Sequence, residues 1–260
     1  MSRARLDRRA IMAGGLGLAL TARAAQAQAQ APLTTPSQIP PQVPPLAPMS
    51  PQEARLRTDW PYLQRYAAEN AVDRDLPAER RRVVFMGDSI TEGWRTARPA
   101  FFVDHGFLGR GISGQVTAQM LVRFWPDVIA LKPRAVHILA GINDIAENAG
   151  PYDPVATQAN LQAMTVLAQA NGVHVVLAAV TPALDFPWRP GLAPPAKVAA
   201  LNDWLRAFAA RSGAGLADYT RVLDDGAGGM RPGLAYDGVH PTAEGYAAME
   251  PVTLTALTNV

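Results

Sequence analysis

The chain has 260 residues, enough for one complete α/β domain, and its 48% hydrophobic and 18% charged residues are typical of a globular protein. It contains no cysteine, which excludes disulfides, thiolate metal sites and a cysteine nucleophile. Five arginines and one aspartate fall within residues 1–29, so without them the formal net charge changes from +2 to −2. We therefore expect no basic surface for nucleic acid.

Residues 1–31 have the features of an export signal. A basic start is followed by a ten-residue apolar run, too short to span a bilayer, and then by alanines offering several A-x-A cleavage positions between Ala24 and Ala31. Arg8 and Arg9 precede the apolar run, as in a twin-arginine signal. The pattern predicts a periplasmic or secreted protein without stable membrane insertion once the signal is removed.

Residues 32–51 contain eight prolines in twenty positions. Because proline lacks a backbone N–H and favours extended geometry, we expect a polyproline-like linker there. Residues 52–260 then form a single domain.

Within this domain, short apolar runs alternate with helical patterns. The runs that predict buried strands lie at 83–87, 106–112, 135–141, 174–180 and 214–219. The helical patterns lie at 93–103, 115–130, 154–171, 196–212 and 243–257. This alternation predicts an α/β fold, a three-layer α/β/α sandwich around a five-stranded parallel sheet, doubly wound in flavodoxin-like order.

Polar residues of possible chemical use gather where the expected strands end. In such a sheet, functional sites form at the carboxyl ends of the strands. The first strand ends at Gly87, which would let the chain turn sharply and place a serine at a helix start. The positions concerned are Asp88-Ser89, Ser113-Gly114, Asn143-Asp144 and, near the C-terminus, Asp237 with His240.

Taken singly, each of these short motifs is typical of a turn or a helix cap. Together they supply the parts of an acyl-transfer site. Ser89 could act as nucleophile once His240 accepts its proton, and Asp237 could orient the imidazole. The Gly114 N–H, the Asn143 amide and the Ser89 N–H could stabilise an oxyanion. We expect Asp88 to brace the turn.

The sequence resembles the SGNH hydrolases, also called GDSL esterases and lipases, over roughly residues 80–258. The four motifs of this family read "GDSITEGW", "RGISGQ", "GIND" and "DGVHP". The resemblance implies Ser89 as nucleophile, His240 as base and Asp237 as its partner, with Gly114 and Asn143 as oxyanion donors. It also implies the three-layer fold, and the chain looks like the exported bacterial esterases of this family.

We therefore expect a serine esterase for short-chain carboxylic esters, including O-acetyl groups on carbohydrates. No long apolar lid that would hold a lipid chain is visible. Trp188 and Arg189, in "DFPWRPG", could contact a sugar or an acidic leaving group, or could be a packing tryptophan beside a solvated arginine.

Other functions are compatible with parts of this pattern. Lysophospholipid or thioester hydrolysis would use the same fold, and a non-catalytic carbohydrate-binding protein would lack Ser89 or His240. A nucleotide-binding protein is disfavoured, because the chain has no G-x-x-x-x-G-K-[ST] loop. The four scattered histidines lack ligand spacing, so we predict no metal and no other cofactor.

Overall fold

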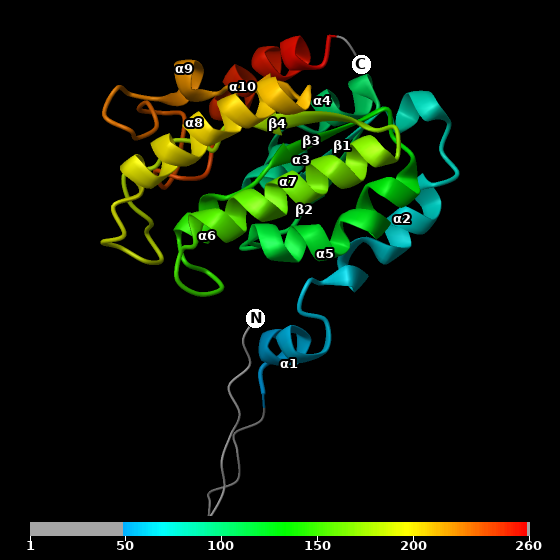
Figure 1. Ribbon diagram of the computed structural model, residues 1–260, viewed down its shortest axis with the longest axis horizontal. Coiled ribbons are helices and arrows are strands. Elements are labelled where there is room, and N and C mark those ends of the chain that lie inside the picture. Colours follow the sequence, from blue (N-terminus) through cyan, green and yellow to red (C-terminus); the bar gives the residue numbers. More distant parts are fainter. Residues whose placement is uncertain (1–48, 259–260) are drawn as a thin grey trace, which may run out of the picture. The chain divides into compact units, whose positions relative to one another are not determined.

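The structure is a computed structural model that describes residues 49–258 (Figure 1). The expected export signal (1–31) and most of the expected linker (32–51) lie outside the described residues. Pro51, at the end of that stretch, is the first residue of helix α1 (Pro51–Thr58), which Ser50 caps. Proline is favoured at the first position of a helix because its missing N–H would have no partner there.

Five parallel strands form one sheet in the order β2-β1-β3-β4-β5. They are β1 (Val83–Gly87), β2 (Phe107–Gly111), β3 (Ala135–Leu139), β4 (His174–Ala178) and β5 (Gly215–Ala217). Gly87 pairs in register with Gly111 and Leu139, so three strands end at one level. The expected fold class and flavodoxin-like order are confirmed, with several strands shorter than their apolar runs.

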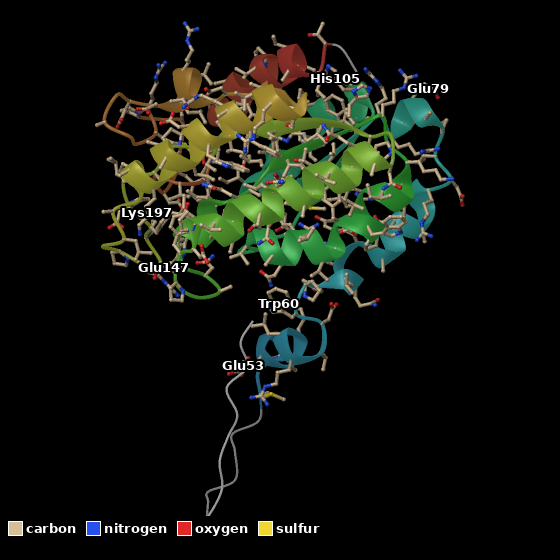
Figure 2. All side chains as sticks on the ribbon, in the orientation of Figure 1. Glu53, Trp60, Glu79, His105, Glu147 and Lys197 are labelled. Carbon is tan, nitrogen blue, oxygen red and sulfur yellow. The ribbon has the colours of Figure 1, made fainter. Side chains whose placement is uncertain are left out.

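Helices cover both faces of the sheet (Figure 1). Helices α5 and α7 pack together on one face, and α3, α4 and α10 pack on the other. Their bounds are α3 (Ser89–Ala97), α4 (Pro99–His105), α5 (Thr117–Asp127), α6 (Ile142–Ile145), α7 (Pro154–Ala170), α8 (Pro194–Ser212), α9 (Thr220–Leu223) and α10 (Ala243–Ala256). Side chains fill the space between these layers (Figure 2), and all five residues of β1 are buried.

The single helix expected at 93–103 was wrong, because this stretch forms α3 and α4. Helix α3 begins at Ser89, where the Asp88 carboxylate accepts a hydrogen bond from the Ile90 N–H. The break lies at Arg98, whose backbone is not helical, and Pro99 starts the second helix. A residue before proline is disfavoured in helical geometry, so the chain turns there.

Besides α1, three further elements that the sequence patterns did not predict precede β1. They are the 3-10 helix η1 (Leu63–Tyr66), helix α2 (Ala67–Asp73) and the 3-10 helix η2 (Ala78–Arg80). Helix α2 packs against α5, and the Asn70 amide donates to the Asp127 carboxylate over 2.6 Å. We call residues 59–73 the N-terminal segment.

Among residues 49–258, no helix combines the length and the apolar character that a membrane crossing requires.

The core beside β1 is rich in aromatic side chains. Phe85 of β1 contacts Trp94 edge to face at 5.7 Å and Phe102 at 5.1 Å between ring centroids. This packing fixes α3 against the end of β1.

Candidate active site

Ser89 is the first residue of α3, two residues beyond the end of β1. Gly87 does not adopt a positive φ, so it is not required for the sharp turn that the sequence suggested. A Cβ at this position would instead overlap the Thr91 hydroxyl and lie 2.7 Å from the Leu139 carbonyl oxygen. The glycine is therefore needed for the close packing of α3 on the sheet, and this packing places Ser89.

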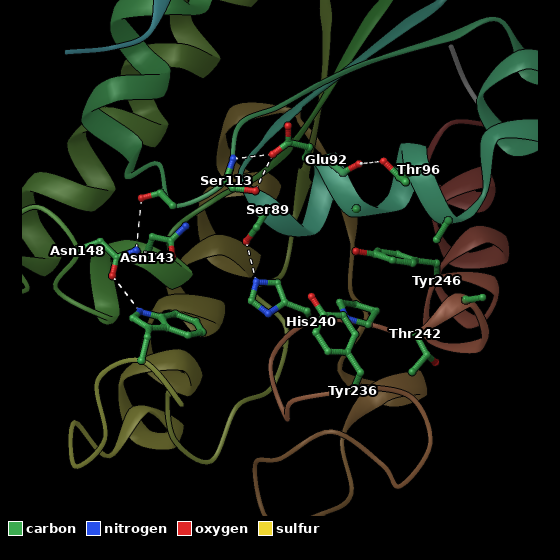
Figure 3. Close-up of a pocket in the computed structure, with 16 residues that line it drawn as sticks. Ser89, Glu92, Thr96, Ser113, Asn143, Asn148, Tyr236, His240, Thr242 and Tyr246 are labelled. Atoms are coloured by element: carbon green, nitrogen blue, oxygen red, sulfur yellow. Dashed lines mark hydrogen bonds between the residues drawn. The ribbon is translucent and has the colours of Figure 1, made fainter. Parts of the chain in front are cut away.

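Ser89, His240 and Asp237 form a continuous hydrogen-bonded chain. Ser89 Oγ lies 2.9 Å from His240 Nε2 (Figure 3), and His240 Nδ1 lies 2.7 Å from Asp237 Oδ2. The other Asp237 oxygen accepts the backbone N–H groups of Val239 and His240 at 3.0 and 2.8 Å. Such a chain can remove the serine proton and stabilise the resulting imidazolium.

The surroundings of Asp237 favour its charged form. Partial burial would raise the pKa of this carboxyl, but hydrogen bonds from the His240 backbone and ring and from Val239 outweigh it, and the pKa lies below its usual value. The side chain is thus ionised throughout the neutral range and can orient the imidazole.

Gly114 and Asn143 line the same pocket as Ser89. The Asn143 amide donates to the Gln115 carbonyl at 3.0 Å, and its oxygen accepts from Asn148 at 2.8 Å. An amide nitrogen carries two hydrogens, so one of them remains for a ligand. The Ser89 N–H begins α3, where backbone donors have no intrahelical acceptor.

Two other carboxylates near the site, those of Asp88 and Asp144, accept hydrogen bonds that hold the starts of helices in place. Asp88 is fully buried and caps α3 through the 2.9 Å bond from Ile90, which is the role expected for it. Burial raises the pKa of Asp88 to about 7. Asp144 accepts the N–H and hydroxyl of Thr117 at 3.0 and 2.6 Å, and so ties α6 to the start of α5.

The pocket around Ser89 has a volume of about 680 Å³ (Figure 3). Trp188 and Tyr236 line it, and their ring centroids lie 5.7 and 5.6 Å from that of His240. Trp188 Nε1 also donates to the Asn148 side chain at 3.1 Å.

The structure does not place Arg189 at this pocket. Its guanidinium donates to the Glu147 carbonyl at 2.6 Å, so the expected contact with a substrate is not supported. Ser113 lines the pocket beside Gly114, and so do Tyr236 and Glu92, which the sequence analysis did not select. In the sequence, an aromatic residue directly before Asp237 is the signal that could have indicated Tyr236.

Within residues 49–258, no three His, Asp or Glu side chains converge in the manner of a metal site. The chemistry at hand is that of Ser89, His240 and Asp237 at the carboxyl ends of a parallel sheet. A fold and an arrangement of this kind are typical of serine hydrolases.

Residues 85–248 match the family model of the GDSL-like lipases and acylhydrolases. The chain therefore belongs to this family, the SGNH hydrolases, and it is an ester-hydrolysing enzyme. The chain has no match among curated proteins.

Several solved structures are similar. A structure from Bacteroides fragilis, assigned as an acylhydrolase, is 44% identical with a TM-score of 0.73, covering 77% of this chain and 97% of the other. A GDSL-like lipase from Bacteroides thetaiotaomicron is 41% identical with a TM-score of 0.73, covering 77% and 98%. An acetyl xylan esterase, 20% identical with a TM-score of 0.55 over 67% and 98% of the chains, shares the fold.

Proposed function

We propose that this enzyme hydrolyses short-chain carboxylic esters through a Ser89–His240–Asp237 triad. The observation that carries the proposal is the pair of contacts, 2.9 Å from Ser89 to His240 and 2.7 Å from His240 to Asp237. This order of groups and distances is what a serine nucleophile requires.

In the first half of the reaction, Ser89 Oγ attacks the ester carbonyl carbon while His240 Nε2 takes the serine proton. The carbonyl electrons move to oxygen, and this oxyanion accepts hydrogen bonds from Gly114, Asn143 and the Ser89 N–H. When the intermediate collapses, the carbon–alkoxy bond breaks and His240 gives its proton to the leaving alcohol.

In the second half, His240 takes a proton from water, and the oxygen of that water attacks the acyl-enzyme. Collapse of the second intermediate breaks the bond to Ser89, which regains its proton from His240. The products are a carboxylic acid and an alcohol, and no cofactor takes part in any step.

We also propose O-acetyl groups on carbohydrates as the substrate class. Trp188 and Tyr236 are 43% and 71% exposed beside His240, and open aromatic faces suit the apolar face of a sugar ring. Because His240 protonates the leaving alcohol, the rings next to it are well placed for a sugar in that position.

The test is a screen of the purified enzyme on p-nitrophenyl esters from acetate to dodecanoate and on acetylated xylooligosaccharides. We expect activity to be highest on acetate and Trp188→Ala to raise KM for the oligosaccharide but not for p-nitrophenyl acetate. Arg189→Ala, outside the pocket, is the matched control. Preference for the long-chain esters over acetate would contradict this substrate class, and so would higher activity on lysophospholipid or an acyl thioester, which are added to the same screen.

A further inference from the structure

The N-terminal segment (59–73) contacts the loop that carries Gly114. It precedes the part of the chain that matches the family model, residues 85–248. We call residues 111–116 the oxyanion loop, since they connect β2 with the start of α5.

Both ends of the oxyanion loop are held by the segment. At the start, the Tyr66 hydroxyl donates to the Gly111 carbonyl, and Tyr66 is only 2% exposed. Toward the end, the Gln115 amide donates to the Pro61 carbonyl at 2.8 Å. The loop therefore takes its position partly from residues outside the family domain.

Glu92 anchors the middle of this loop. It lies one turn after Ser89 on α3, and its Oε2 accepts the N–H and the hydroxyl of Ser113 at 2.9 and 2.6 Å (Figure 3). Its Oε1 accepts from the Arg65 guanidinium of the segment at 3.1 Å. One carboxylate thus links the nucleophile helix, the oxyanion loop and the segment.

Gly114 itself has few contacts, and its carbonyl accepts one long hydrogen bond, of 3.4 Å, from the Asn148 amide. A Cβ on it would have no atom within 4 Å, so no neighbouring side chain or backbone packs against that face. In contrast, a Cβ at Gly111 would overlap the backbone nitrogen of Glu92. The loop is tightly packed on α3 at its start, and Gln115 is held at its end by Pro61 and Asn143. Between these points, the Glu92–Ser113 contacts hold the residue directly before Gly114.

We propose that Glu92, held in place by Arg65, is a positioning residue that aims the Gly114 N–H at the oxyanion. This role rests on the proposed function of Ser89 and of the oxyanion donors. Misplacement of a catalytic group by about 1 Å can cost roughly 10²-fold in rate, so an anchor next to a donor has a measurable effect on kcat.

The variants Glu92→Ala and Arg65→Met test this role on p-nitrophenyl acetate. We expect Glu92→Ala to lower kcat by roughly tenfold or more, with KM within about twofold of the unmodified enzyme. Arg65→Met, which removes the outer anchor only, should lower kcat in the same direction by less. Glu92→Gln keeps an acceptor for Ser113 and should recover most of the loss.

Glu69→Gln is the matched control. Glu69 binds Arg95 at 2.8 Å and lies 3.9 Å from Arg65, so its replacement perturbs the same charges without touching the loop. The kcat of Glu69→Gln should stay unchanged.

Phenylboronic acid, whose adduct with the serine is tetrahedral and anionic, supplies a second readout. Its inhibition constant should rise in Glu92→Ala in proportion to the loss of kcat/KM.

A merely structural role would lower the melting temperature and leave both readouts unchanged, and direct contact with substrate would change KM alone. Either result overturns the positioning role. Should Glu92→Ala not fold, Arg65→Met decides on the same two readouts, because Arg65 is partly exposed.

Ser89→Ala is measured in parallel to separate this role from the proposed function. Activity retained in Ser89→Ala would overturn both proposals. An inactive Ser89→Ala together with full kcat in Glu92→Ala would overturn the positioning role only.

Discussion

Asn143 owes its orientation to two hydrogen bonds, one to the Gln115 carbonyl and one from the Asn148 side chain. These bonds fix the amide plane before substrate binds, and they leave the second amide hydrogen free to donate to the oxyanion. A donor that is fixed before the reaction stabilises the intermediate more than the ester, because no rearrangement accompanies the development of charge.

Replacement of Asn143 by Ala should therefore lower kcat by on the order of 10²–10³ and leave KM nearly unchanged. Steady-state kinetics on p-nitrophenyl acetate measure both constants. Asn148→Ala removes one of the two supports and should have a smaller effect on kcat. A variant of Asn143 with normal kcat and raised KM would show that this amide binds substrate only.

Ser89 and Asn143 could be predicted because each follows a strand, and parallel strands end at one edge of the sheet. His240 lies on the loop before α10 rather than after a strand, and the structure brings it to the same pocket. Arg189 could not be placed in this way, since it lies in a loop whose backbone turns through a bond from Arg189 N–H to the Phe186 carbonyl. Glu92 was missed because its role depends on a loop from another part of the chain.

At the scale of elements, apolar runs predict the five strands, and their ends differ from the structure by at most a few residues. The break between α3 and α4 was missed, although Pro99 marks it. The N-terminal segment has no clear periodicity, and its contacts are long-range, such as Asn70 to Asp127 and Gln119 to the Trp60 carbonyl. Its position could not follow from local pattern alone.

The N-cap of α3 leads to a prediction about stability and pH. Burial raises the pKa of Asp88 to about 7, whereas the ordinary value is 3.8. The folded state thus binds this proton more tightly than the unfolded state, so the contribution of Asp88 to the free energy of unfolding falls as pH rises from about 4 to about 7. Above pH 7 the folded protein contains a buried carboxylate.

Asp88→Asn removes this titration and keeps an acceptor for the Ile90 N–H. We compare the free energy of unfolding of the variant with that of the unmodified protein at each pH. This difference should shift in favour of the variant by on the order of 2 kcal/mol between pH 5 and pH 8. Urea unfolding of both proteins at both pH values measures the difference. Burial lowers the pKa of His137 to about 3. This histidine is present in both proteins, so its contribution to the pH dependence cancels in the difference. An equal stability difference at the two pH values would rule out a titrating Asp88.

At the scale of the whole molecule, the sequence divides into an N-terminal part outside the described residues and a domain that carries the site. The basic and apolar residues 1–31 bear on where the enzyme works. We propose export through a twin-arginine signal, because Arg8 and Arg9 directly precede the apolar run. A carbohydrate ester outside the cytoplasm would agree with that location.

Replacement of both Arg8 and Arg9 by Lys should abolish export while leaving the kcat of the purified domain unchanged. Cell fractionation measures the location, and the intact mass of the exported protein should place its N-terminus between Ala24 and Ala31. Export of the double variant at the normal level would contradict the twin-arginine route, and an uncleaved exported protein would contradict the signal assignment.

The most direct test of the account is covalent labelling of the nucleophile by a serine-directed fluorophosphonate, followed by peptide mapping. We predict one adduct per chain, on Ser89, with loss of esterase activity in proportion to labelling. Ser89→Ala should carry no adduct and should lose several orders of magnitude in kcat, and His240→Ala should label far more slowly. An adduct on a different residue, or an active Ser89→Ala enzyme, would contradict the account.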